Sequence, residues 1–222
     1  MIPIKDNIPT RTFPIITVGI IFVNISVFIW QSFLSPREEE QLFLYLGLIP
    51  RELTLALSSR IEILPYNLVT LFTSMFLHGG VFHVVGNMLY LWIFGNNIED
   101  SFGHGRFAFF YLLSGVFAAI VQYLYDPLSN VPMIGASGAV SGVLGAYLVL
   151  YPYARVITLV FIFIFVKIVE LPALIFLTFW FLMQFLHSGM EGVAWYAHIG
   201  GFIFGIFMGR LFAKRRVKRL WR

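Results

Sequence analysis

The chain has 222 residues, of which 59% are apolar or aromatic and 12% are charged, and its mean hydropathy is +0.85. These values exclude a soluble globular protein, a disordered chain and a typical nucleic-acid binder, because soluble domains are about 45–50% apolar and about 25% charged. The lack of cysteine excludes disulfides, thiolate metal sites and a cysteine nucleophile. The lipid bilayer is therefore the expected environment of the chain.

The net charge of +4 does not predict a nucleic-acid partner, because the basic residues gather at one end of the chain. Seven of the 15 Lys and Arg residues lie in the last thirteen positions. Basic residues beside a membrane span mark its cytoplasmic side. We therefore expect residues 213–222 to form a basic cytoplasmic tail.

The apolar segments predict an all-α polytopic membrane protein with six transmembrane helices. A spanning helix needs about 20 apolar residues, and the first such segment follows a short tail, 1–12, that carries Lys5 and Arg11. This segment is too long for the apolar region of a signal peptide. The predicted helices cover residues 13–34, 79–98, 105–125, 136–151, 172–187 and 193–212.

Two stretches do not fit a spanning helix. Residues 35–65 carry five acidic and three basic residues among apolar ones, which predicts an outer loop with short amphipathic helices at the membrane surface. The apolar run in 154–171 is short and rich in β-branched residues, which favours an extended or interfacial loop over a helix. Six spans place both termini on one side, and the basic tail predicts that this side is the cytoplasmic face of a plasma-type membrane.

Polar residues within the predicted spans are candidate functional groups, because burying them in lipid is costly. His83 and Asn87 lie four residues apart in the helix over 79–98, so they share one face of that helix. His78 precedes them at or before the helix start. These three residues are expected near the outer end of an inward-running helix.

The next two inward-running helices carry polar residues at a similar depth. Ser137 lies in the first turn of the helix over 136–151, and His198 lies near the start of the helix over 193–212. Glycines recur in both helices at the spacing that lets membrane helices approach closely: Gly135, Gly138, Gly142 and Gly145 with the first, and Gly201, Gly205 and Gly209 with the second. We therefore expect Ser137 and His198 to lie within reach of each other.

In this order and on these helices, the motifs resemble those of the rhomboid family of intramembrane serine proteases. The resemblance covers most of the chain, from about residue 66 to 212. It rests on His78, His83 and Asn87, on Glu99 with Gly103, on the box Gly135-Ala136-Ser137-Gly138, and on Ala197-His198 followed by Gly201 and Gly205. The resemblance implies a bundle of six helices whose short central fourth helix starts midway in the membrane, below a dipping loop that the turn-rich residues 126–135 would form.

The resemblance also implies the chemistry. Ser137 would be the nucleophile and His198 its general base, as a dyad without a third acid. Asn87, His83 and the Ser137 backbone N–H would stabilise the oxyanion, and Gly135, Gly138, His78, Gly201 and Gly205 would support the site. The implied substrates are single-span membrane proteins cut near the outer face, with no metal or other cofactor.

Two departures from the family pattern stand in the sequence. Residues 67–70 read Asn-Leu-Val-Thr where many relatives carry a Trp-Arg pair, which predicts a different anchor for the outer loop. Ser141 stands where relatives often place an aromatic residue against the histidine. A hydrogen bond from Ser141 and stacking by another aromatic residue are therefore both open as the means of orienting His198.

Two other functions fit parts of the pattern. His78, His83 and His198 could hold zinc through three imidazoles, which would make the chain a polytopic metal-binding membrane protein, either a metalloprotease or a transporter. That alternative lacks a carboxylate base at the same depth and gives Ser137 no role. A secondary transporter would show repeated halves, and no repeated motif is visible in the sequence.

Overall fold

The computed structural model describes residues 1–162, 165–187 and 194–214. Its α-helices are α1 (Ile15–Gln31), α2 (Pro36–Leu46), α3 (Pro50–Ser58), α4 (Leu64–Thr73), α5 (Val81–Tyr90), α6 (Asn96–Phe102), α7 (His104–Tyr125), α8 (Ser137–Leu150), α9 (Ala173–His187) and α10 (Trp195–Phe212). Short 3-10 turns lie at Ile61–Ile63 and Ser74–Phe76, and a π-helical turn at Leu91–Gly95 joins α5 to α6. The strands are β1 (Ile2–Asp6), β2 (Arg155–Ile162) and β3 (Phe165–Pro172).

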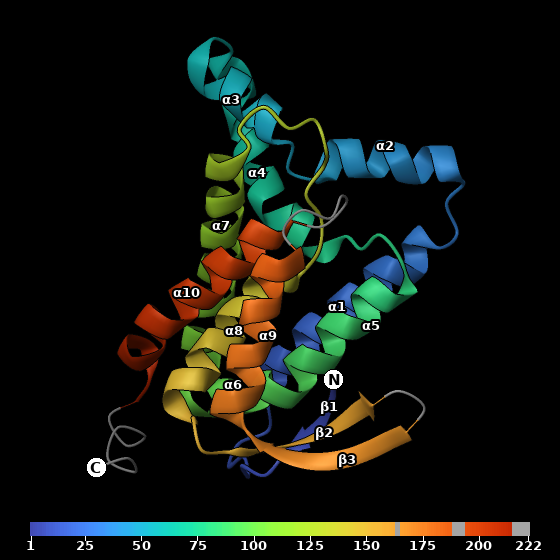
Figure 1. The fold of residues 1–222 in the computed structure, drawn as a ribbon. Coiled ribbons are helices and arrows are strands. Elements are labelled where there is room, and N and C mark those ends of the chain that lie inside the picture. The colour runs from blue at the N-terminus through green and yellow to red at the C-terminus, as the bar shows by residue number, and fades with distance from the viewer. Residues whose placement is uncertain (163–164, 188–193, 215–222) are drawn as a thin grey trace.

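Helix α8 forms the centre of the bundle, packed against α7 and α10 (Figure 1). Small and apolar residues surround it on every side, and every residue from Gly138 to Tyr147 is buried. Its 14 residues span about 21 Å at 1.5 Å per residue, which is less than the roughly 30 Å hydrocarbon core of a bilayer. The expectation of a short central helix is confirmed.

Glycines bring the backbones of α8 and α10 into direct contact. A Cβ atom added at Gly201 would overlap the carbonyl oxygen of Gly138, and one added at Gly205 would overlap that of Gly142. No side chain larger than hydrogen therefore fits between the helices at these levels. The close approach predicted from the small-residue spacing is confirmed.

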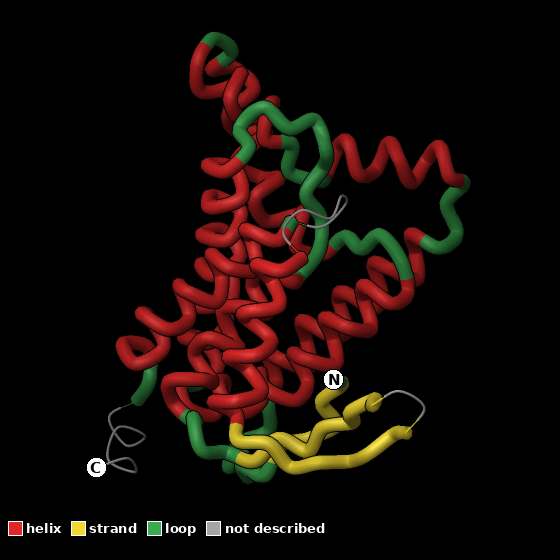
Figure 2. The backbone as a smooth tube through the Cα atoms, in the orientation of Figure 1, coloured by secondary structure: helices red, strands yellow, loops and turns green. Residues whose placement is uncertain are grey.

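The prediction of an all-α fold is incomplete, because the chain also forms a three-stranded antiparallel sheet at one end of the bundle (Figures 1 and 2). The stretch 154–171 is extended as expected, but it is a hairpin of β2 and β3 rather than a loop. Its β-branched residues suit paired strands. The third strand is β1, in the predicted N-terminal tail, which pairs with β2 from Ile2↔Leu159 to Asp6↔Val156.

A buried polar network attaches this sheet to the helices. Asp6 at the end of β1 accepts hydrogen bonds from the Asn97 side chain, over 2.6 Å, and from the hydroxyl of Tyr147. These donors belong to α6 and α8, so one carboxylate joins the sheet to both helices.

Glu99, one of the motif residues, closes the start of α1. Its fully buried carboxylate accepts hydrogen bonds from the N–H groups of Ile16 and Thr17 over 2.9 and 2.8 Å. The first N–H groups of a helix lack partners within the helix, and a negative charge there is favourable. Glu99 thus fixes α1 against α6.

The predicted outer loop 35–65 contains the short helices α2 and α3, as expected, at the end of the molecule opposite the sheet (Figure 1). Side chains of α4 anchor it where the Trp-Arg pair is missing. The Thr73 hydroxyl donates to the carbonyl oxygen of Leu46 over 2.7 Å. The Tyr66 hydroxyl donates to the backbone carbonyl oxygen of Tyr45. These hydrogen bonds from α4 hold the end of α2.

The helices that coincide with the six predicted spans differ in length. Among the described residues, α7 alone is long and apolar enough to cross a membrane, and a second crossing results if the helices over Ile61–Phe76 and Val81–Phe102, bent by 84°, count as one span. Helices α1, α8 and α9 are apolar but shorter. The count of six spans stays a prediction. The start of the span over 193–212 and most of the basic tail, at 215–222, lie outside the described residues.

Candidate active site

The loop that precedes α8 places Ser137 at the first position of that helix. Met133 in this loop pairs with Leu48 through two backbone hydrogen bonds of 2.8 and 3.1 Å, and the Gly135 N–H donates to the carbonyl oxygen of Ser74 over 2.8 Å. Gly135 has a φ of +117°, a conformation that residues with a Cβ rarely adopt. The turn that presents Ser137 therefore requires glycine at position 135.

His198, in the first turn of α10, meets Ser137 directly. The His198 Nε2 atom lies 2.8 Å from the Ser137 Oγ atom. The glycine contacts between α8 and α10 hold the two residues at this separation. The two residues thus form the pair that the sequence predicts, at hydrogen-bond distance.

The opposite edge of the His198 ring contacts a residue that the sequence reasoning missed. His198 Nδ1 lies 2.9 Å from Oε1 of Gln184, on α9. The sequence predicts a dyad without a third acid, and Gln184 is a neutral residue on a neighbouring helix. The available signal was a polar residue inside the apolar segment 172–187.

Ser141 does not orient His198 through a hydrogen bond. Its hydroxyl donates to the carbonyl oxygen of Ser137 over 2.7 Å, the common back-bond of serine within a helix. The aromatic contacts of His198 come from other elements. The Trp180 ring centroid on α9 lies 6.3 Å from that of His198, and the Trp195 centroid at the start of α10 lies 5.7 Å from it, edge-on.

His83 lies beside the turn that carries Ser137. A Cβ atom added at Gly135 would lie 2.6 Å from His83 Nε2 and 3.7 Å from Ser137 Oγ. The Gly79 N–H faces His83 Nδ1 over 3.4 Å, which favours a proton on Nε2. Glycine at position 135 therefore leaves space between a ring N–H and the serine hydroxyl.

Asn87 follows His83 one turn further along α5 and is 8% exposed. Its side-chain Nδ2 atom has no hydrogen-bond partner among the described residues. Buried amide donors are normally paired, so an unpaired one is available to a ligand. The role of Asn87 as an oxyanion donor stays a prediction.

His78 contacts both His83 and the turn before Ser137. It is fully buried, and its ring meets that of His83 edge-on with 5.0 Å between centroids. The Ala136 N–H points to His78 Nε2 over 3.5 Å, and the His78 backbone is bonded in both directions to the Gln31 side chain. His78 therefore links α1 to the turn before Ser137.

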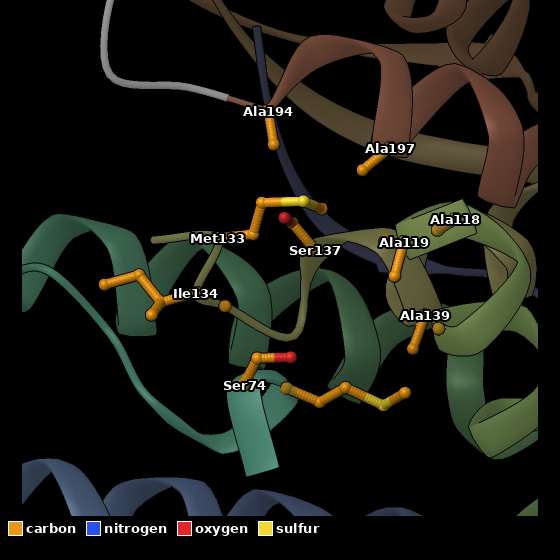
Figure 3. Close-up of a pocket in the computed structure, with 13 residues that line it drawn as sticks. Ser74, Ala118, Ala119, Met133, Ile134, Ser137, Ala139, Ala194 and Ala197 are labelled. Atoms are coloured by element: carbon orange, nitrogen blue, oxygen red, sulfur yellow. The ribbon is translucent and has the colours of Figure 1, made fainter. Parts of the chain in front are cut away.

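A small cavity of about 30 Å³ lies beside Ser137. Figure 3 shows Ser137 between the Met133–Ile134 segment and the start of α10, where Ala194 and Ala197 lie. Most of the remaining lining comes from small residues of α7 and α8: Gly115, Ala118, Ala119, Gly138 and Ala139. Gly138 packs tightly, since a Cβ there would lie 2.7 Å from Cβ of Ala118.

The three histidines of the metal-binding alternative do not converge on a metal-sized point. In the part of the chain that the structure describes, no group of three His, Asp or Glu side chains has a geometry that could hold a metal ion. Both nitrogens of His198 face other partners, Ser137 and Gln184. The arrangement of these side chains favours a serine mechanism over a metal site.

Comparison with known proteins places the chain among related sequences. A family model described as "Rhomboid domain" matches residues 65–215. The chain is similar to "RHOMBOID-like protein 1" of Arabidopsis thaliana, with 29% identity over 91% of this chain and 54% of that protein. It is similar to "Rhomboid protease GluP" of Bacillus subtilis, with 41% identity over 35% of this chain and 15% of that protein. It is also similar to "Rhomboid protein 1, mitochondrial" of Saccharomyces cerevisiae, with 33% identity over 42% of this chain and 28% of that protein.

These matches span about half the length of the first relative and less of the other two. The residues matched by the family model include the whole site: His78, His83, Asn87, Ser137, Gln184 and His198.

Proposed function

Because this chain belongs to the rhomboid family, whose members are integral membrane proteins, we propose that it is an intramembrane serine endopeptidase with Ser137 as nucleophile and His198 as general base. The hydrogen bond of 2.8 Å between Ser137 Oγ and His198 Nε2 carries the proposal. A serine hydroxyl attacks a peptide carbonyl only when a neighbouring base accepts its proton, and a neutral imidazole at this distance is such a base.

The proposed reaction uses the two residues twice. His198 Nε2 takes the proton from Ser137 Oγ as this oxygen bonds to the carbonyl carbon of the substrate. The protonated imidazole then gives the proton to the leaving amine nitrogen as the peptide bond breaks. Water hydrolyses the resulting ester of Ser137, again with His198 as base, and restores the free serine.

The negative charge that develops on the carbonyl oxygen requires preorganised donors. We assign this role to the Asn87 amide, His83 Nε2–H and the Ser137 backbone N–H. The unpaired Nδ2 of buried Asn87 and the position of His83 Nε2 beside the turn at Gly135 support the assignment. Gly135 contributes the space in which the oxygen would lie.

The cavity beside Ser137 limits which residue can be cleaved. About 30 Å³ is room for roughly one or two water-sized groups, and its walls are largely alanine and glycine. A methyl side chain fits this space, whereas an aromatic ring does not. We therefore assign to the enzyme substrates with a small residue at the cut.

The proposal includes six crossings with both termini in the cytoplasm, and the charge supports this orientation. The outer loop 35–65 carries five acidic and three basic residues, whereas Lys5, Arg155 and Lys214 lie at the end of the bundle with the sheet. Positive residues favour the cytoplasmic side. Helix α8 runs from Ser137 toward that end, so the cut lies in the outer half of the bilayer. The proposed location is a plasma-type membrane.

A fluorophosphonate probe tests the proposed function most directly, because it bonds covalently to an activated serine. We expect the purified wild-type protein to be labelled at Ser137, with the same yield in the presence of a metal chelator. Mass spectrometry of the labelled peptide identifies the site. Labelling that a chelator abolishes, or that persists in Ser137→Ala, would contradict the serine mechanism.

The substrate prediction concerns the cut residue and the helix around it. A peptide bond within an intact transmembrane helix is hydrogen-bonded and crowded, so the substrate must unwind locally. Glycine and proline lower the cost of unwinding. For a single-span substrate cut after alanine and followed by Gly-Pro, we expect Ala→Phe at the cut, or Gly-Pro→Leu-Leu, to reduce kcat/KM at least about tenfold.

Two controls accompany this measurement in proteoliposomes. The same phenylalanine placed one helical turn outside the cut does not enter the cavity, which still receives the alanine at the cut. This substrate should be cleaved at the original rate. A substrate with the cleavable segment moved to the cytoplasmic end of the span should be resistant. Undiminished cleavage of the altered substrates would contradict this account of selectivity.

A further inference from the structure

Gln184 is held in a single orientation beside His198. It lies on α9 with 5% of its surface exposed. Its Nε2 atom donates a hydrogen bond of 2.8 Å to the backbone carbonyl oxygen of Trp180, one turn earlier in the same helix. The amide nitrogen has only hydrogens to offer that carbonyl. The amide oxygen therefore faces the histidine.

This orientation determines which nitrogen of His198 carries the proton. Gln184 Oε1 lies 2.9 Å from His198 Nδ1, and an amide oxygen can only accept a hydrogen bond. Nδ1 must therefore be the protonated nitrogen of the neutral ring. The lone pair is then on Nε2, 2.8 Å from the Ser137 hydroxyl, where a general base needs it.

We propose that Gln184 is a positioning residue that fixes the tautomer and the ring orientation of His198, and the inference rests on the proposed function. It takes the place that an acidic residue holds in a Ser-His-Asp triad. The burial of the site explains a neutral residue there, because an unpaired carboxylate inside the membrane would be costly. Trp180 and Trp195 flank the ring.

The main test replaces Gln184 by methionine, which keeps the length of the side chain but offers the Nδ1–H group only a weakly accepting sulfur. We expect Gln184→Met to lower kcat about tenfold to a hundredfold, the scale of loss for a misplaced catalytic group, with KM within about twofold of wild type. In Gln184→Glu the protonated carboxyl group can donate to the Trp180 carbonyl and still offer an oxygen to Nδ1–H, so this variant should recover at least a third of the wild-type kcat. Leu182→Ala, at a side chain that is 53% exposed on the same helix, is the matched control and should leave kcat unchanged.

Nitrogen NMR of protein labelled at histidine measures the tautomer without any substrate. The His198 signals, identified by their loss in His198→Ala, should show a protonated Nδ1 and an unprotonated Nε2 in wild type. In Gln184→Met the two forms should mix, while Gln184→Glu should keep the wild-type pattern. If Gln184→Met does not fold, Gln184→Leu provides the same comparison.

The outcomes separate the two proposals. An unchanged kcat in Gln184→Met, or a reduced kcat with the wild-type nitrogen pattern, would overturn the role of Gln184, since the latter result reveals only a packing defect. A wild-type protein that neither reacts with the fluorophosphonate nor cleaves any substrate would overturn the proposed function. The nitrogen spectrum would still report whether Gln184 sets the tautomer of His198.

Discussion

Ser137→Ala and His198→Ala should each lower the cleavage of a single-span substrate by about 10⁵–10⁶-fold, to the background rate. The two side chains share one hydrogen bond of 2.8 Å and act as a unit, so removing either one removes the activated nucleophile. The double variant should therefore be no less active than either single variant. Cleavage in proteoliposomes, followed by gel electrophoresis of the products, measures all three.

Two further variants calibrate this result. Ser141→Ala removes a hydroxyl that only bonds back to its own helix and should leave the rate within about threefold of wild type. Asn87→Ala removes one proposed oxyanion donor and should cost about 10²–10³ in kcat. Activity within tenfold of wild type in Ser137→Ala or His198→Ala would contradict the dyad assignment. An unchanged rate in Asn87→Ala would show that this residue is not part of the site.

Gly205→Leu should inactivate the enzyme without touching a reacting atom. A Cβ atom at this position already overlaps the carbonyl oxygen of Gly142, so a leucine side chain must push α10 away from α8. His198 would move with α10 while Ser137 stays on α8. A displacement of about 1 Å can cost a hundredfold in rate, so we expect the cleavage rate to fall by at least that factor. Gly201→Leu should have the same effect.

The movement itself can be measured, because the chain has no native cysteine. Spin labels on Tyr153→Cys and Leu211→Cys, at two exposed positions beyond α8 and near the end of α10, report the separation of the helices. Gly19→Leu is the matched control, since no atom lies within 4 Å of a Cβ added there, and it should change neither the distance nor the rate. A fully active Gly205→Leu variant with an increased separation would show that close packing is not needed for catalysis.

The positions of the helices and of the candidate catalytic residues could be predicted from the sequence, because both are local properties. The spacing of His83 and Asn87 places them on one face of α5 whatever the surroundings, and the position of Ser137 at a helix start follows from the turn-forming residues 126–135 before it. The glycine repeats of α8 and α10 also predict their approach, since only small residues let backbones touch.

The remaining features depend on contacts between different elements that no local sequence pattern marks. Strand β1 exists because β2, about 150 residues later, offers it an edge, and the tail 1–12 carries no local sign of that pairing. The contact of His198 with Gln184 likewise joins two different helices. Gln184 is neutral and lies outside the three inward-running helices, so carboxylates on those helices give no sign of it.

The sequence alone therefore determined the membrane environment, most of the helices and the pair Ser137–His198, because composition, periodicity and spacing act over a few turns of chain. Only the tertiary structure decided that Gln184 meets His198, which residues enclose the cavity beside Ser137, and that the N-terminal tail completes a sheet. Each of these depends on atoms from different elements meeting within a hydrogen bond or a van der Waals contact, and packing alone determines such distances.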